Sequence, residues 1–384
     1  MKITEKIISK IEGEATLKIK GDEFIEFVEI EFWQYHGIEN YLKNRHFMDA
    51  LVINPRICGI CGHSHLYASV KAIEKVFNAK VPKKARIFRE ITSLLEIVEN
   101  HIKWFYITIF PTRVKKDEFL FKAVKFSSKI SKAIAILAGQ FPHNSYMVPG
   151  GVTCDPTYME IMRLKDLIRE IYEEYIEEIM DEDLNSKDLN LFFEGLPKEI
   201  GKGLNRFLVL GESGLFKRNG DVNFVSEEKN SSLSKNALYK NEFYEVGPLA
   251  RMINNKKIKK IYSQYSDSVY TRICARVYEP LIIFEYLLKI IDEIDLCEHS
   301  YIKPDIKNGR SIVSVEAPRG SLIHEISIKN EKIEKYNIIV PTQFNLSSSK
   351  KRFSPAQAAL INEKREYLNE IFKCFDICAV CMSH

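Results

Sequence analysis

The spacing of apolar residues along the chain predicts long helices. Apolar side chains recur with helical period over residues 84–110, 123–140 and 271–295, which indicates core helices. Asp155-Pro156 is a typical helix start, and the helix predicted after it carries an apolar stripe opposite a face rich in glutamate. We expect this helix to lie at the surface. The stripe consists of Ile161, Leu164, Ile168, Ile171, Tyr175 and Ile179.

Alternation of apolar and polar residues predicts two hairpins. Residues 15–32 alternate around Gly21-Asp22, which indicates an N-terminal antiparallel hairpin with one buried face. Residues 325–342 alternate around Asn330 in the same way, and Ser354-Pro355 then opens the last predicted helix. The segment 215–243 is polar and contains Gly, Asn and Ser, so we expect a long loop or short irregular strands there.

Composition and charge exclude several classes of protein. The chain has 384 residues, of which 45% are hydrophobic and 28% charged, as expected for a protein with a large core. A net charge of +4 gives no electrostatic footprint for nucleic acid. We find no run of apolar residues long enough for a transmembrane segment, and no export signal at the start. These observations predict a cytoplasmic protein, associated with a membrane only through a partner.

The cysteines point to a metal site. Eight cysteines are few for this length, which argues against a disulfide scaffold. Four of them form two CxxC pairs, Cys58 with Cys61 and Cys378 with Cys381, which lie near opposite ends of the chain. A local zinc ribbon closes its two halves within a much shorter segment. We therefore expect the fold to bring both pairs together in one site with four thiolates.

The sequence resembles the large subunit of nickel-iron hydrogenases over nearly the whole chain. The resemblance rests on Arg-x-Cys-Gly-x-Cys-x-x-x-His at 56–65 and Asp-x-Cys-x-x-Cys-x-x-His at 376–384. It implies an α+β fold, a single mixed domain over residues 1–384 in which a long-helix bundle dominates and the antiparallel sheets are small. Further matching segments are Ile11-Glu12-Gly13, Gly37-Ile38-Glu39, Gly150-Gly151-Val152, Gly247-Pro248-Leu249-Ala250-Arg251, Glu316-Ala317-Pro318-Arg319-Gly320 and Val340-Pro341-Thr342.

The resemblance implies the chemistry of the cysteines. Cys58, Cys61, Cys378 and Cys381 would bind nickel, with Cys61 and Cys381 also bridging to an iron that carries carbon monoxide and two cyanides. Soft thiolates suit both metals. In heterolytic cleavage of H2, Cys378 would take the proton first and Glu12 would take it next. A partly desolvated carboxylate has a raised pKa, which suits such a relay.

Other residues would surround the iron. The resemblance implies that Arg319 donates a hydrogen bond to one cyanide and serves as an alternative base, while Thr342 donates to the other cyanide. Pro318 and Pro341 would shape the same pocket, and His65 would hydrogen-bond a cysteine sulfur. Thr112 stands where the family has an aspartate, which removes one carboxylate near Arg319. We therefore expect Asp376 to hold Arg319 and turnover to be lower than in typical members.

A second metal site is implied near the C-terminus. Glu39 and His384 match side-chain ligands of a magnesium or iron ion, and the carbonyl of Ile338 would be a third ligand. Oxygen and imidazole ligands completed by water are compatible with a hard divalent ion.

The resemblance also implies partners. H2 is the substrate, and electrons would pass to a small subunit with iron-sulfur clusters, because no further cluster motif remains in this chain. Maturation proteins would assemble the site. Two alternatives stay open: a hydrogen sensor with the same site and slow turnover, and a zinc-bound structural relative. The quinone-site subunit of respiratory complexes shares the fold but lacks both cysteine pairs, so the four cysteines argue against it.

Overall fold

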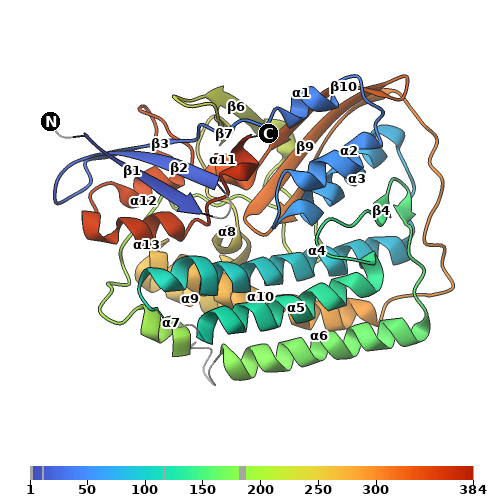
Figure 1. Cartoon of the computed structure of the whole chain (residues 1–384), viewed down its shortest axis with the longest axis horizontal. Helices are drawn as coiled ribbons and strands as arrows, with labels where there is room; N and C mark the ends of the chain where they lie inside the picture. Colours follow the sequence, from blue (N-terminus) through green and yellow to red (C-terminus); the bar gives the residue numbers. More distant parts are fainter. Residues whose placement is uncertain (1–2, 11–12, 116–117, 181–186, 384) are drawn as a thin grey trace.

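Long helices form one layer of the protein, as the computed structural model in Figure 1 shows. The structure describes residues 3–10, 13–115, 118–180 and 187–383. Helix α4 contacts α5 and α10, and α6 contacts the same two helices, so the four build an antiparallel bundle. Their bounds are α4 (Lys83–Lys103), α5 (Glu118–Ala138), α6 (Tyr158–Glu178) and α10 (Val269–Ile291).

The predicted periodicity of these helices is confirmed. Helix α4 continues through a π-helical turn, Trp104–Ile109, and a 3₁₀ turn, Phe110–Thr112, so the helical backbone covers the predicted range. Every residue of the predicted stripe on α6 is buried. Helix α6 begins slightly after Asp155-Pro156, because Thr157 forms a capping box with Glu160.

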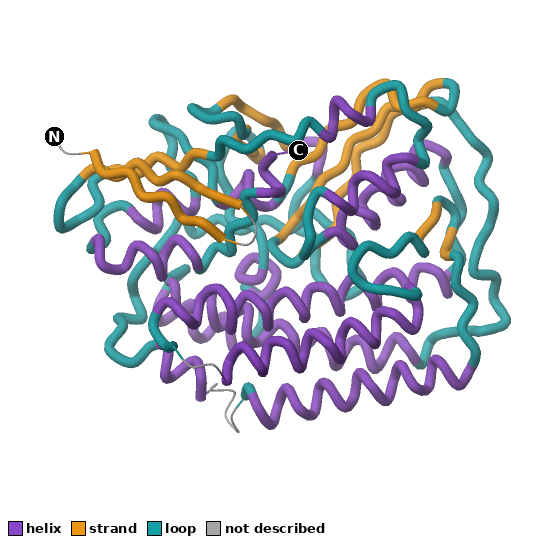
Figure 2. Tube along the Cα trace, in the orientation of Figure 1, coloured by secondary structure: helices purple, strands orange, loops and turns teal. Residues whose placement is uncertain are grey.

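Small antiparallel sheets form a second layer on one side of the helix bundle (Figure 2). The two larger ones have the strand orders β1-β2-β3 and β10-β9-β8, while β4 pairs with β5 and β6 with β7. The strand bounds are β1 (Ile3–Lys10), β2 (Gly13–Lys20), β3 (Phe27–Glu31), β4 (Met147–Val148), β5 (Gly151–Val152), β6 (Val225–Lys229), β7 (Lys235–Tyr239), β8 (Gly309–Ala317), β9 (Gly320–Lys329) and β10 (Lys332–Ile339).

Both predicted hairpins are present, and each has a third strand that the sequence pattern did not predict. In the first, Lys20 pairs with Phe27 across the turn that contains Gly21. In the second, Asn330 and Glu331 both have positive φ, as a two-residue turn between twisted strands requires. Strand β1 extends the first hairpin and β8 extends the second. The segment 215–243 contains the short strands β6 and β7, as expected.

Short helices connect these layers. Helix α3 packs against β8, β9 and α4, so it joins the C-terminal sheet to the bundle. None of the helices in the described part of the chain is long and apolar enough to cross a membrane. The remaining bounds are α1 (Ile38–Leu42), α2 (Asp49–Ile53), α3 (Gly62–Phe77), α7 (Lys187–Phe192), α8 (Pro248–Met252), α9 (Lys256–Tyr265), α11 (Pro341–Asn345), α12 (Pro355–Leu360) and α13 (Leu368–Lys373).

The helix at Ser354-Pro355 begins as predicted, but it is not the last helix. Ser354 caps α12 through a capping box with Gln357. The helix ends after Leu360, where Ile361 is extended and Asn362 has a positive φ, and α13 follows as a separate helix. The expectation of one domain over residues 1–384 stays a prediction.

Candidate metal centre

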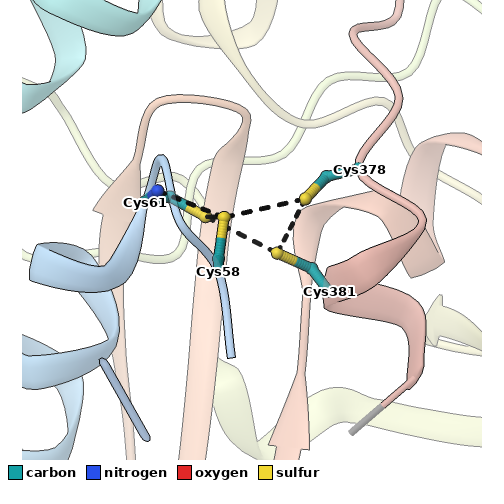
Figure 3. Close-up of side chains that lie close together, drawn as sticks. All are labelled: Cys58, Cys61, Cys378 and Cys381. Atoms are coloured by element: carbon teal, nitrogen blue, oxygen red, sulfur yellow. Dashed lines mark hydrogen bonds between the residues drawn. The ribbon is translucent and has the colours of Figure 1, made fainter. Parts of the chain in front are cut away.

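The two cysteine pairs meet in the interior, although they come from opposite ends of the chain. The Sγ atoms of Cys58 and Cys378 lie 3.8 Å apart, and those of Cys61 and Cys381 lie 3.5 Å apart. All four sulfurs lie within 4.8 Å of one another, all four side chains are buried, and none forms a disulfide. Figure 3 shows the pairs facing each other from two separate segments. Four soft donors at this spacing fit a thiophilic metal.

The thiols share their protons unequally. Hydrogen bonds from Cys378 and the other thiols hold the pKa of Cys58 well below its usual range, and the nearby Arg319 charge acts in the same direction. Hydrogen bonding with Cys378 and the other two thiols, together with burial, raises the pKa of Cys381 well above its usual range. The cluster therefore contains ready thiolates, the form in which cysteine binds metals.

The first pair is positioned by the start of α3. Cys58 and Cys61 lie between a 3₁₀ turn and this helix, and the backbone N–H of Cys61 donates to Cys58 Sγ at 3.1 Å. Gly62 follows, and a Cβ atom here would lie 2.3 Å from the carbonyl oxygen of Pro55. Only glycine allows this close approach, so Gly62 fixes the path of the loop around the sulfurs.

Glu96 on α4 anchors the end of this loop through hydrogen bonds, a role that the sequence did not reveal. Its carboxylate accepts the backbone N–H groups of His63 and Ser64, each at 3.0 Å, at the positive end of α3. Burial raises the pKa of Glu96 to about 8. Helix α4 is buried on almost all sides, so the apolar periodicity gave no signal that distinguishes this glutamate.

Arg319 lies in the tight turn between β8 and β9, where Ala317 pairs with Gly320. Its Nη2 donates to Asp376 Oδ1 at 3.3 Å, and its Nε lies 3.1 Å from Asp376 Oδ2. Both side chains are buried. The structure thus places Arg319 against Asp376, two residues before Cys378.

Arg251 holds this turn in place. Its guanidinium donates to the carbonyl oxygens of Ala317 at 2.9 Å and Pro318 at 3.1 Å, and it forms a buried, bidentate ion pair with Glu279. The motif Gly247-Pro248-Leu249-Ala250-Arg251 was matched in the sequence without a role for Arg251. The structure assigns it to the backbone beside Arg319.

The remaining predicted residues are placed as follows. Pro341 and Thr342 begin α11, which contacts the turn Val380–Ser383 that carries Cys381. The backbone N–H of Ile338 donates to Glu39 Oε1 at 2.7 Å, so these two predicted ligands lie together. Glu12 and His384 lie outside the described residues.

His65 has a buried histidine neighbour that the sequence did not predict. His65 Nδ1 lies 3.2 Å from His324 Nε2, and His324 Nδ1 lies 2.8 Å from the Tyr336 hydroxyl. The hydrogen bond from His65 to a cysteine sulfur stays a prediction. His324 lies on β9, in the hairpin whose alternation gave no sign of a polar pair in the core.

Comparison with known proteins identifies the family. The model of the family described as nickel-dependent hydrogenase matches residues 36–108, 117–226 and 214–384. This chain belongs to the nickel-dependent hydrogenase family. It is therefore a hydrogenase-type oxidoreductase, and the resemblance seen in the sequence is confirmed. The buried thiolate cluster fits the metal in the family's description.

Relatives match along most of their length. The alpha subunit of coenzyme F420 hydrogenase from Methanothermobacter thermautotrophicus is 26% identical over 374 residues, covering 91% of this chain and 85% of that protein. The large subunit of the periplasmic [NiFeSe] hydrogenase from Desulfomicrobium baculatum is 24% identical, covering 90% and 86%. A solved H2-activated [NiFeSe] hydrogenase from Dm. baculatum superposes with a TM-score of 0.87 at 22% identity, covering all of both chains. The predicted fold class is therefore confirmed.

Proposed function

We propose that the chain is the catalytic subunit of a nickel-iron hydrogenase, which converts H2 reversibly into two protons and two electrons. One observation carries the proposal: four buried cysteine side chains from both ends of the chain converge within reach of a single ion. A closed structural zinc site also uses four cysteines. Such a site has no need of buried arginine and hydroxyl donors around it, whereas Arg319 and Thr342 are both buried in the elements that flank these sulfurs.

The four cysteines would hold the metals. Cys58 and Cys378 would bind nickel as terminal ligands, and Cys61 and Cys381 would bind nickel together with an iron that carries one carbon monoxide and two cyanides. This bimetallic group supplies the site at which H2 is polarised and its electrons are taken up. Sulfur ligands suit both metals, because they allow oxidation states to change in a buried site.

The chain's own residues would move the proton and bind the anionic ligands. Cys378 would accept the proton at Sγ, and Glu12 would take it next. While its Nε and Nη2 contact Asp376, Arg319 would donate a hydrogen bond to one cyanide, and the Thr342 hydroxyl would donate to the other. Burial of the cysteines excludes water, which strengthens each of these interactions.

We propose a hard cation, magnesium or iron, at Glu39, the Ile338 carbonyl and His384. The contact between Glu39 and the Ile338 backbone supports this assignment, because it already places a carboxylate beside the strand that would supply the carbonyl ligand. Exchange of Glu39 for Gln should release this ion and leave nickel in place, as metal analysis of the purified protein would measure.

We propose that a small subunit with iron-sulfur clusters accepts the electrons. Among the described residues, the four cysteines are the one group of three or more metal-ligating side chains close enough to share an ion, and we assign them to the catalytic site and onward electron transfer to another chain. Exposed apolar side chains in the segment before Cys58 suit such a partner. They belong to Trp33, Tyr35, Tyr41 and Val52, each more than half exposed.

Maturation proteins would assemble the metals, and we propose a location in the cytoplasm or at a membrane through a partner. Fractionation of cells, with detection of the chain and of its small subunit in each fraction, tests this placement. Recovery of the complex from the periplasm would contradict it.

Infrared spectroscopy tests the proposed function directly. The protein is purified with its partner, and nickel is quantified in the same sample. Bands for one carbon monoxide and two cyanides, with one nickel per chain, are expected. Zinc in place of nickel, without those bands, would overturn the proposal. The rate of H2 oxidation then separates an enzyme from a hydrogen sensor.

A further inference from the structure

A second buried arginine shares the carboxylate that holds Arg319. Arg276 on α10 places Nη1 2.9 Å from Asp376 Oδ2, the same oxygen that lies 3.1 Å from Arg319 Nε. The side chains of all three residues are at most 6% exposed. Two guanidinium groups thus meet one carboxylate in the interior, next to the cysteine cluster.

Both arginines contact Oδ2 of Asp376, and Arg319 also contacts Oδ1. Arg319 approaches the carboxylate side-on, with Nε at Oδ2 and Nη2 at Oδ1, and its Nε also donates to the Asp376 carbonyl oxygen at 3.2 Å. Arg276 reaches Oδ2 from α10. Asp376 itself has a φ of 55°, a left-handed conformation that its neighbours must stabilise.

Arg276 is in turn fixed by Trp104. The guanidinium carbon lies 4.3 Å from the centroid of the indole ring, within range of a cation–π interaction. Trp104 Nε1 donates to the carbonyl oxygen of Lys373 at 3.1 Å, three residues before Asp376. Arg276 and Trp104 therefore contact the segment 373–376 at two points, and this segment leads directly to Cys378.

Burial of Arg276 is unfavourable for its charge. Desolvation lowers its pKa, the Arg319 charge adds to this effect, and only Asp376 opposes them strongly. A buried cation that shares its counter-ion contributes little to stability compared with an apolar side chain of the same volume. The arrangement is better explained by the geometry that it imposes on Asp376.

We propose that Arg276 is a positioning residue of the metal site, which clamps the Asp376 carboxylate so that Arg319 keeps its direction toward the ligands of the iron. The inference rests on the proposed function and deepens it. Arg276 acts through Asp376 and Arg319, and it contributes positive charge that balances an anionic metal group.

Two variants of Arg276 and one matched control test this role. Arg276→Gln removes the charge. Arg276→Lys keeps the charge but lacks the planar guanidinium group, which donates several hydrogen bonds and stacks on aromatic rings. The control is Arg272→Gln, one turn earlier on α10. Arg272 is equally buried and stacks on Phe375 at 4.3 Å, but its charge is paired with Glu245 at 2.8 Å.

The measurements use the complex purified with its small subunit. In Arg276→Gln we expect the cyanide bands to shift and kcat to fall about tenfold or more, the usual consequence of losing a group that orients a metal's surroundings. Arg276→Lys should recover part of both effects. Arg272→Gln should lower the unfolding midpoint and leave the cyanide bands at their wild-type positions.

Two readouts do not depend on the metals. The chain has two tryptophans, Trp33 and Trp104, and only Trp104 contacts Arg276, so the difference in fluorescence between variant and wild type reports on that contact. Amide exchange of residues 374–379 should be at least about tenfold faster in Arg276→Gln than in Arg272→Gln.

The outcomes separate the inference from the function on which it rests. Wild-type protein without the infrared bands would refute the proposed function. The role of Arg276 would be refuted if the wild-type protein shows the infrared bands and Arg276→Gln shows the same bands, unshifted, with unchanged kcat. If Arg276→Gln does not fold, the test compares Arg276→Lys with Arg272→Gln. An equal loss of kcat in these two variants would mean that Arg276 acts through packing alone, and it would overturn the inference.

Discussion

Glu96 accepts the backbone N–H of His63 at 3.0 Å, which places a buried carboxyl group at the first turn of α3, immediately after Cys61. The same carboxyl group accepts the N–H and the hydroxyl of Ser64. The loop that carries Cys58 and Cys61 is therefore attached to α4 through Glu96, and Asn100 on the same helix donates to the carbonyl oxygen of Ile60 at 3.2 Å.

This attachment should make stability depend on pH. Burial raises the pKa of Glu96 from 4.5 to about 8, so the folded protein retains a proton that the unfolded chain has lost between these values. The free energy of unfolding should fall as pH rises through this window, by about 5 kcal/mol in all, because each unit of pKa shift corresponds to about 1.4 kcal/mol. Urea unfolding at several pH values should show that the free energy of unfolding falls less steeply with pH in Glu96→Gln than in the wild type. Parallel curves for the two proteins would contradict the assignment.

Nickel content should depend on Cys378 and not on the nearby Cys374. Cys378→Ser replaces a soft donor with a hard one, and we expect less than about a tenth of the wild-type nickel per chain. Cys374 lies in the same segment and is buried, but it is not part of the cluster. Cys374→Ser is therefore the control and should retain its nickel. Equal nickel in both variants, measured by mass spectrometry of the metals, would place the metal elsewhere.

Arg251 should be among the least replaceable residues of the core. Arg251→Met leaves Glu279 buried with His101, 2.6 Å away, as its remaining partner, and we expect a loss of about 3–5 kcal/mol in unfolding free energy. The double variant Arg251→Met with Glu279→Gln should recover part of this loss, because the stranded charge is removed. A double variant that loses the full sum of both single changes would show that the two residues act independently.

Turnover should rise when a carboxylate is restored at position 112. Thr112 donates its hydroxyl to the carbonyl oxygen of Ile109 at 2.7 Å, at the end of the 3₁₀ turn after α4. Thr112→Asp should add a second acceptor for Arg319 and increase kcat, whereas Thr112→Asn, of the same shape without the charge, should not. Unchanged or reduced turnover in Thr112→Asp counts against the idea that this position limits the enzyme.

The elements that the sequence predicted well are those with a regular apolar pattern. The stripe from Ile161 to Ile179 identified α6, and the alternation around Asn330 identified the β9–β10 hairpin. Strand β8 was not predicted, although it pairs with β9 along its whole length. Its residues are buried on both faces toward the end, so the pattern no longer alternates.

The candidate site divides in the same way. The spacing of the two CxxC pairs predicted a metal site, because few functions other than metal binding need cysteines in this order. The pairs are Cys58 with Cys61 and Cys378 with Cys381. The pairs of Arg276 with Asp376 and of Glu96 with the start of α3 join segments far apart in the chain. A charged residue within a buried helix gives no sign in the sequence of the partner that neutralises it.

The meeting of Cys58 and Cys378, 320 residues apart, has a thermodynamic consequence for the whole molecule. A metal bound by both would act as a cross-link that closes a loop of most of the polypeptide. By the relation used for disulfides, closure of such a loop removes unfolded-state entropy equivalent to about 6 kcal/mol. The metal would then hold the ends of the chain together mechanically as well as react with H2, and its removal would widen the conformational space of the unfolded chain.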